Sequence, residues 1–238
     1  MPFRKELIDE INNYCTGHLA DTEWYEACFD FIEDAYLRTR LIEEFKGIRF
    51  FHKLYEGLQA TDENQILEVR YQIFAYATIY EATLHYVLFH YYGDTQEVKD
   101  MQYEPRLIKI DLPQYKDERL QKALEHNGHE IIPCYKSSKK IEEAQIRFET
   151  KCDVAEKLGL IYNYEKADGE TVEFIKKIKE IYSQRNAIHL AAEKKKGISY
   201  ELELSKTAYL RMQPFIEQIQ SKLKEDHKWQ PKNPETDM

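Results

Sequence analysis

Several features that identify common classes of enzyme are missing from this sequence. It has no glycine-rich loop of the kind that cradles phosphates, no serine in a nucleophile elbow and no internal repeat. Its few cysteines show none of the paired spacings typical of metal sites; they are Cys15, Cys28, Cys134 and Cys152. We therefore expect reduced thiols, no metal and no cofactor.

Long apolar runs are also missing. The most apolar stretch, residues 71–92, carries Gln72, Glu81, His85 and His90, which favours a buried helix over a membrane span. No secretory signal is evident in the first residues. Together these features predict a cytoplasmic protein without a membrane partner.

The chain does contain a cation beside an imidazole, near the end of a long predicted helix. Arg185 and His189 are four residues apart, so in a helix they stand on one face. A guanidinium neutralises charge on phosphate oxygens, and an imidazole exchanges protons near neutral pH. Asn186 adds an amide donor and acceptor. The group suits phosphodiester chemistry, although a surface pair or a hydrogen-bonded core histidine has the same spacing.

The segment Arg185-Asn186-Ala187-Ile188-His189-Leu190 resembles the signature of the HEPN superfamily (higher eukaryotes and prokaryotes nucleotide-binding). That family consists of all-helical domains that often form homodimers. Many members are metal-independent ribonucleases of toxin–antitoxin, abortive-infection and CRISPR systems. The usual signature has Arg, a polar residue that is often Asn, and a more distant His, whereas here only three residues separate Arg185 from His189.

The resemblance implies that Arg185, Asn186 and His189 are catalytic, with Glu81 and Tyr182 in support. HEPN-like proteins often place an acidic residue near the motif from an earlier helix. A buried carboxylate is costly unless it is paired, so we expect Glu81 to have a partner. Arg185 is one candidate, and a purely structural partner is the alternative.

Positive charge gathers around this motif, although the chain as a whole is acidic. The formal net charge is −9, which argues against nucleic-acid binding over the whole surface. Lysines nevertheless flank the motif: Lys176, Lys177 and Lys179 before it, and Lys194, Lys195 and Lys196 after it. We expect the second group to bind substrate, and a solvated helix face is the alternative.

Hydrophobic periodicity predicts an all-α fold. The resemblance implies that this fold is a helical bundle of HEPN type. One helical domain should span residues 1–228, with a short β segment near 198–204 and a disordered tail at 229–238. Within the domain we expect N-terminal helices over 1–92, an irregular insertion over 93–140 and the motif-bearing bundle over 141–228.

Glycine, proline and capping residues predict where the helices begin and end. In the N-terminal part we expect one helix ending at Gly17, one from Asp21 or Thr22 past Leu41 to a break at Gly47, one over Phe50–Leu58 and one from Thr61 to Tyr92. The insertion should contain one helix over Gln114–His126. After it we expect one helix from Lys139 or Lys140 to Leu158, the motif helix from Thr171 to Gly197, and a last helix from Ser205 that is kinked or restarted at Pro214.

The leading functional hypothesis is a ribonuclease that acts on RNA without a metal. His189 would activate the ribose 2′-hydroxyl or protonate the leaving oxygen, and Arg185 would stabilise the transition state. Two proton transfers need two groups, so a homodimer with a composite active site is expected. An antitoxin or another defence-complex protein is the further partner that the resemblance implies.

Two other functions remain open. One is a non-catalytic helical protein-interaction module, which the eighteen tyrosines and the acidic charge favour. The other is a nucleotide- or RNA-binding domain in which Arg185 and the lysines hold phosphate without cleaving it. Tyrosines serve helix packing, interfaces and base stacking alike, so their number does not separate these functions.

Overall fold

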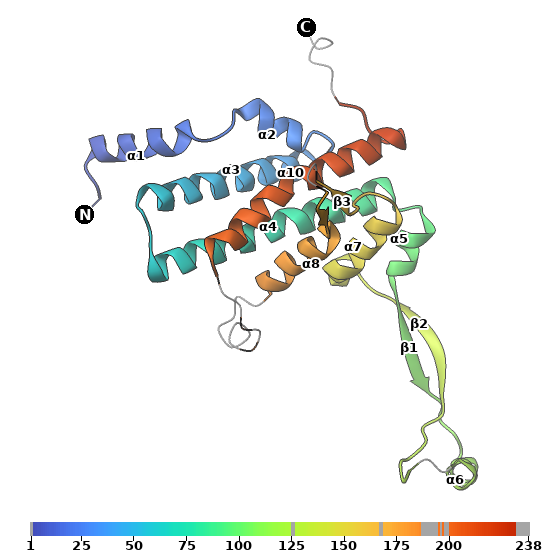
Figure 1. The fold of residues 1–238 in the computed structure, drawn as a ribbon. Helices are drawn as coiled ribbons and strands as arrows, with labels where there is room; N and C mark the ends of the chain where they lie inside the picture. Colours follow the sequence, from blue (N-terminus) through green and yellow to red (C-terminus); the bar gives the residue numbers. More distant parts are fainter. Residues whose placement is uncertain are drawn as a thin grey trace. The chain divides into compact units, whose positions relative to one another are not determined.

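The structure is a computed structural model that describes residues 2–124, 127–166, 169–186, 195, 197 and 200–231. The chain divides into two compact units, Met1–Gly93 with Arg147–Met238, and Asp94–Ile146. We call the first the bundle unit and the second the ribbon unit. Figure 1 shows the elements of both.

The described part of the bundle unit is helical apart from one very small antiparallel sheet of two-residue strands, β3 and β4. Its elements in chain order are α1 (Lys5–Gly17), α2 (Thr22–Cys28), α3 (Ala35–Gly57), α4 (Asp62–Tyr91), α7 (Phe148–Lys157), β3 (Tyr164–Glu165), β4 (Thr171–Val172), α8 (Phe174–Arg185) and α10 (Leu202–Glu225). The predicted helical bundle is confirmed for this unit.

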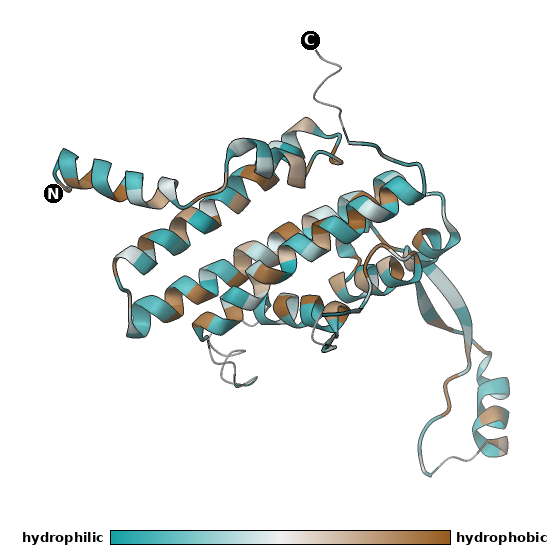
Figure 2. Ribbon diagram, turned by 45° about the horizontal axis from the view of Figure 1, so that its top comes forward, coloured by the Kyte–Doolittle hydropathy of each residue, from teal (hydrophilic) through white to brown (hydrophobic). Residues whose placement is uncertain are grey.

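Helix α4 lies at the centre of the bundle unit, and α3, α7, α8 and α10 all pack against it. It is apolar on most of its sides, as a helix surrounded by others must be; Ile73, Ile79 and Leu84 are fully buried. Figure 2 shows apolar residues along α4 and its neighbours. Among the described residues, no helix is both long enough and apolar enough to cross a membrane.

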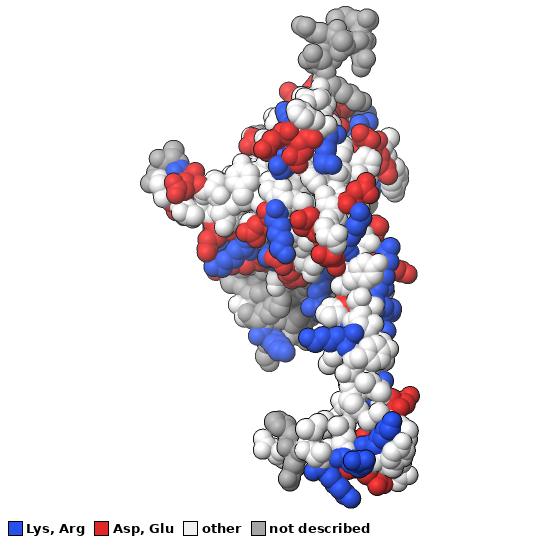
Figure 3. Space-filling model, turned by 90° about the vertical axis from the view of Figure 1, so that its right-hand side faces the viewer, with Lys and Arg blue, Asp and Glu red and all other residues white. Residues whose placement is uncertain are grey.

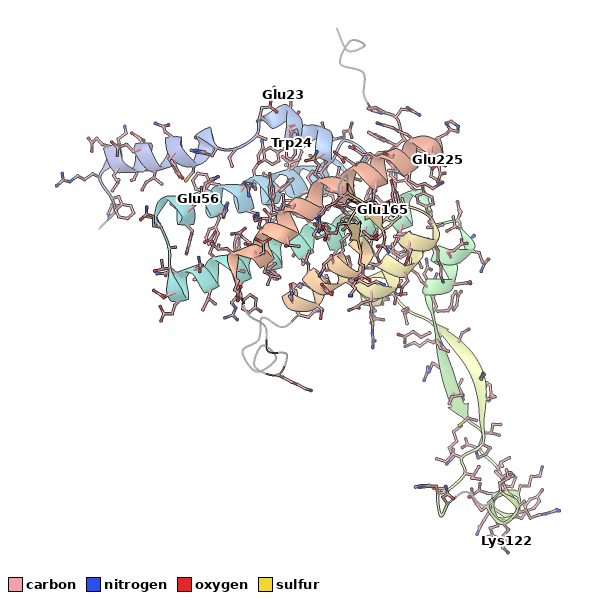
Figure 4. All side chains as sticks on the ribbon, in the orientation of Figure 1. Glu23, Trp24, Glu56, Lys122, Glu165 and Glu225 are labelled. Atoms are coloured by element: carbon pink, nitrogen blue, oxygen red, sulfur yellow. The ribbon has the colours of Figure 1, made fainter. Side chains whose placement is uncertain are left out.

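Aromatic rings fill the space between α2, α3 and α4. The ring of Phe45 lies edge-on to those of Tyr25, Phe29 and Tyr76, with centroids 5.3, 6.2 and 6.3 Å away. Trp24, labelled in Figure 4, adds a further ring at 5.8 Å from Phe45. Edge-to-face pairs of this kind add stability beyond the area they bury. These tyrosines therefore serve helix packing, one of the roles expected from the sequence.

The ribbon unit is organised around a two-stranded antiparallel sheet. Strands β1 and β2 pair from Tyr103 opposite Lys140 to Lys109 opposite Cys134. The elements of the unit are α5 (Gln96–Met101), β1 (Tyr103–Lys109), α6 (Gln114–Ala123), β2 (Cys134–Lys140) and a 3₁₀ turn, η1 (Glu143–Gln145). The predicted insertion over 93–140 falls within it, apart from Gly93. The chain is thus mostly helical, with two small sheets.

The predicted long helix after Asp21 is wrong in its limits. Helix α2 ends at Cys28, and α3 begins after Asp34, whose carboxylate accepts a hydrogen bond from the backbone N–H of Leu37 at 2.9 Å. That cap restarts the helix. No break occurs at Gly47, because the buried stripe of α3 continues past it and holds the helix together.

The helices on either side of the motif are shorter than predicted. Helix α7 begins at Phe148, because Lys139 and Lys140 belong to β2 and pair with β1. Helix α8 begins at Phe174, because Thr171, the predicted cap, pairs with Glu165 in the small sheet. In both cases the sequence pattern missed a short antiparallel pairing.

The end of the bundle unit also differs from expectation. The predicted β segment near 198–204 is wrong for its last three residues, since α10 begins at Leu202 rather than Ser205. Helix α10 continues through Pro214 without restarting, although that residue has no N–H to donate. Trp229, expected to open a disordered tail, packs edge-on against Phe31 with ring centroids 6.1 Å apart.

Candidate functional site

A hydroxyl bridges the two predicted partners, Glu81 on α4 and Arg185 on α8. The hydroxyl of Tyr182 donates a hydrogen bond to Glu81 Oε1 at 2.9 Å and accepts one from Arg185 Nη1 at 2.9 Å. The same Nη1 lies 3.6 Å from Glu81 Oε2. The expected contact between Arg185 and Glu81 is therefore present, and Tyr182 completes it.

Helix packing fixes the tyrosine that makes this bridge. The ring of Tyr182 stacks on that of Phe148 of α7, with centroids 4.3 Å apart and planes 25° from parallel. Tyr182 is almost fully buried, whereas its hydroxyl reaches the rim of the bundle where Glu81 lies. This stacking makes α7 and the motif helix α8 neighbours in the bundle.

Arg185 is held on one side and open on the other. Its guanidinium carbon lies 5.1 Å from the ring of Tyr182 and 5.6 Å from the ring of Phe74, and its side chain is 27% exposed. Within the part of the chain that the structure describes, its polar contacts with Glu81, Tyr182 and Asn186 all use Nη1. Among the described residues, Nε and Nη2 make no such contact and can bind an anion.

The environment of Tyr182 keeps its hydroxyl protonated. Burial, together with the hydrogen bond to Glu81 and the negative charge of that carboxylate, raises the pKa of Tyr182 to about 12, while the positive charge of Arg185 opposes the rise. A hydroxyl with such a pKa does not act as a base near neutral pH. Tyr182 thus holds Glu81 and Arg185 in place.

The other predicted catalytic residues follow the end of the helix. Helix α8 ends at Arg185 instead of continuing to Gly197, and Asn186 forms its C-cap. The Oδ1 atom of Asn186 accepts a long contact of 3.5 Å from Arg185 Nη1. His189 lies outside the described residues, so its expected position above Arg185 stays a prediction.

The lysines around the motif contribute less free charge than expected. Those that precede it pair with carboxylates: Lys176 with Glu173 at 2.7 Å, Lys177 with Glu180 at 2.9 Å and Lys179 with Asp153 at 2.5 Å. Of the three predicted substrate-binding lysines, Lys195 is exposed, and Lys194 and Lys196 lie outside the described residues. The alternative of a solvated helix face applies to the first group.

A second polar cluster was missed by sequence reasoning. His52 Nδ1 lies 2.9 Å from Oε1 of Glu68, a buried residue, which also accepts a hydrogen bond from Gln72 Nε2 at 2.7 Å. The cluster borders a cavity of about 460 Å³ that Arg49 also lines. The signal was available, because Glu68 sits in the same apolar helix as Glu81 and needed a partner for the same reason.

No group of three or more potential metal ligands occurs among the described residues. Comparisons with protein-family models, with curated proteins and with solved structures found no match. The resemblance to HEPN proteins therefore depends on the motif residues themselves.

Replacing Tyr182 by Phe tests the bridge. We expect the free energy of unfolding to fall by about 1 kcal/mol, at the low end for a bond to a charged group because Glu81 and Arg185 are partly exposed to water. The neutral hydroxyl has a higher pKa in the folded state, so its contribution is complete below pH 10 and is lost as pH rises towards 12. Urea unfolding of the wild type and of Tyr182→Phe, from pH 8 upward, measures the difference between their free energies of unfolding.

The control for this test is Tyr36→Phe, because Tyr36 is 77% exposed. Removing the exposed hydroxyl of Tyr36 should leave the urea concentration at the midpoint of unfolding unchanged at every pH. Equal effects of the two substitutions, or a Tyr182→Phe difference that grows above pH 10, would contradict the bridge.

Proposed function

We propose that this chain is a HEPN-like, metal-independent endoribonuclease. The observation that carries the proposal is the position of Arg185: a carboxylate and a hydroxyl from two packed helices hold its Nη1. Its Nε and Nη2 keep the planar pair of donors that grips two oxygens of one phosphate. An arginine fixed before substrate arrives can stabilise developing charge without reorganising.

In the proposed reaction the ribose 2′-oxygen attacks the adjacent phosphorus, and the bond from phosphorus to the 5′-oxygen breaks. One proton leaves the 2′-hydroxyl and one is taken up by the departing 5′-oxygen, so the products are a 2′,3′-cyclic phosphate and a 5′-hydroxyl. His189 performs one of these transfers. Arg185 neutralises the charge that develops on the non-bridging oxygens of the reacting phosphate.

A second copy of the chain supplies the other histidine in this proposal. An exposed apolar stripe on α4 supports such a dimer: Leu67, Tyr71 and Phe74 are 55, 40 and 42% exposed and recur at helical spacing. Phe74 also lies beside Arg185, so burying the stripe against its symmetry mate would bring two copies of Arg185 towards one interface. On the same resemblance, the setting is a toxin–antitoxin or phage-defence system with an antitoxin or defence-complex partner.

The alternative is a non-catalytic helical module for protein interaction or for binding a nucleotide or RNA. The pairing of Arg185 with Glu81 favours it, because a neutralised arginine attracts phosphate less strongly than a free one. In that case the bridge would serve only to hold α4 against α8. Activity measurements separate the two functions.

Cleavage of mixed RNA by the purified protein in EDTA is the test of the proposed activity. His189→Ala should lower the rate by about 10²-fold or more, the usual scale for a positioned acid or base. Arg185→Lys should also be damaging, because a lysine is a point charge without the planar pair of donors. Gel separation of end-labelled RNA over time measures the rates.

Matched controls are His129→Ala and Arg40→Lys, since both residues are exposed and lie away from the motif in sequence. These two should cleave at the wild-type rate. Unchanged cleavage by the motif variants would assign the activity to other residues or to a contaminant. If the motif variants fail to fold, the bridge is structural and the non-catalytic alternative is favoured.

The dimer is tested by Leu67→Glu, which places charge on the exposed stripe. We expect the wild type to sediment as a dimer at tens of micromolar, about the level at which a functional dimer persists, and the variant as a monomer. Tyr36→Glu places the same charge on another exposed ring and should leave the dimer intact. A monomeric wild type would contradict the composite site.

A further inference from the structure

The two strands of the ribbon unit carry positive charge in an otherwise acidic chain. Strands β1 and β2 contain five cations, namely Arg106, Lys109, Lys136, Lys139 and Lys140, against the single carboxylate of Glu104. Five minus one gives a formal charge of +4, whereas the whole chain carries −9. Figure 3 shows the Lys and Arg side chains. A local basic element of this kind is the electrostatic feature expected of a polyanion-binding site.

The strand register sorts these charges onto two faces. Cross-strand partners share a face, and successive residues alternate between faces. Lys109, Lys136 and Lys140 therefore share one face that has no acidic residue, whereas Glu104 lies on the other face opposite Lys139. We call the first the lysine face; it consists of Tyr103, Pro105, Leu107, Lys109, Cys134, Lys136, Ser138 and Lys140.

The lysine face is open to solvent, and its charges are unpaired within the described residues. Every residue of the face is exposed. Lys109, Lys136 and Lys140 form no ion pair there, in contrast to the paired lysines of α8. Lysines on free strand edges also prevent aggregation, but lysines on either face would do this equally well. Protection of the edge therefore does not explain why three lysines share one face.

Exposed apolar side chains lie among these lysines. Leu107 is 71% exposed and Tyr103 is 49% exposed, and Tyr103 pairs across the strands with Lys140. A ring beside an ammonium group offers a surface on which an unpaired base can stack while its phosphate meets the charge. A purely electrostatic surface for duplex backbone would have no use for the ring.

We propose that the lysine face binds single-stranded RNA, with Lys109, Lys136 and Lys140 at phosphates and Tyr103 under a base. From Lys140 to the end of the ladder at Lys109 is six residue steps of β-strand, about 20 Å, which accommodates a few nucleotides. The proposal goes beyond the proposed ribonuclease, because binding at the ribbon does not require cleavage at Arg185. It rests on the proposed function only in that the bound RNA would be the substrate of the ribonuclease.

Binding is measured by fluorescence anisotropy with a labelled, fully 2′-O-methylated oligoribonucleotide of about twelve nucleotides, which cannot be cleaved by its own 2′-oxygen. The variant carries Lys109→Gln, Lys136→Gln and Lys140→Gln. We expect at least about tenfold weaker binding and a salt dependence less steep by about 2 in log–log slope, since each phosphate contact on a single strand contributes about 0.7.

A second triple variant, with Lys5→Gln, Lys157→Gln and Lys206→Gln, removes the same charge from exposed positions of the bundle unit. It should keep its affinity and salt slope. Tyr103→Ala should weaken binding while leaving the slope unchanged, because a ring contacts no phosphate. Circular dichroism of all variants confirms that they fold.

Equal losses in the two triple variants would overturn the proposal, since they would reflect net charge alone. Tighter binding to duplex DNA or to anionic phosphatidylserine vesicles than to the oligoribonucleotide would also overturn it. The binding test and the cleavage test can fail separately. If only the lysine-face triple variant loses binding and the protein has no nuclease activity, the lysine face is supported and the proposed ribonuclease function is overturned. If the triple variant binds as the wild type does and the protein cleaves RNA, the ribonuclease function is supported and the lysine face is overturned.

Discussion

Helix α4 is apolar on most of its sides and packed on most of them, so each buried or half-buried carboxylate along it must find a partner from a neighbouring helix. Glu81 meets Tyr182 and Arg185 of α8, and Glu68 meets His52 of α3. The need to compensate buried or half-buried charge therefore decides which residues of α3 and α8 lie against α4. It also explains why an arginine near the end of α8 has a defined position.

That position connects packing with the proposed chemistry. The contacts that hold Arg185 come from Glu81 and Tyr182, and its own ring neighbours, Phe74 and Tyr182, exclude water from one side. A guanidinium held in this way has lost part of its freedom before it meets a phosphate, so less entropy is lost on binding. The same pairing lowers its net charge, which makes additional cations useful for gathering RNA. The ribbon unit carries such cations on strands whose residues the core does not need.

Sequence reasoning succeeded where one physical requirement dominated. Capping signals predicted the limits of α4 and the start of α6 at Gln114. The cost of an unpaired carboxylate required a partner for Glu81 and left Arg185 as one candidate, and the structure brings the two together. Sequence reasoning failed where a distant partner decided the outcome. A local pattern places Lys139 and Lys140 in a helix because it does not show that β2 pairs with β1. The weak helix propensity of Gly47 predicts a break, but burial of the surrounding stripe outweighs that propensity and α3 continues through it.

In the proposed ribonuclease, Glu81 acts on RNA cleavage only by holding Arg185. A double-mutant cycle tests it most directly, with cleavage rates measured for wild type, Glu81→Gln, Arg185→Lys and the double variant, each confirmed as folded by circular dichroism. The double variant should cleave no more slowly than Arg185→Lys alone, because the contribution of Glu81 disappears with the group it positions. Losses that multiply in the double variant would show that Glu81 and Arg185 act independently, which would contradict a purely positioning role for Glu81.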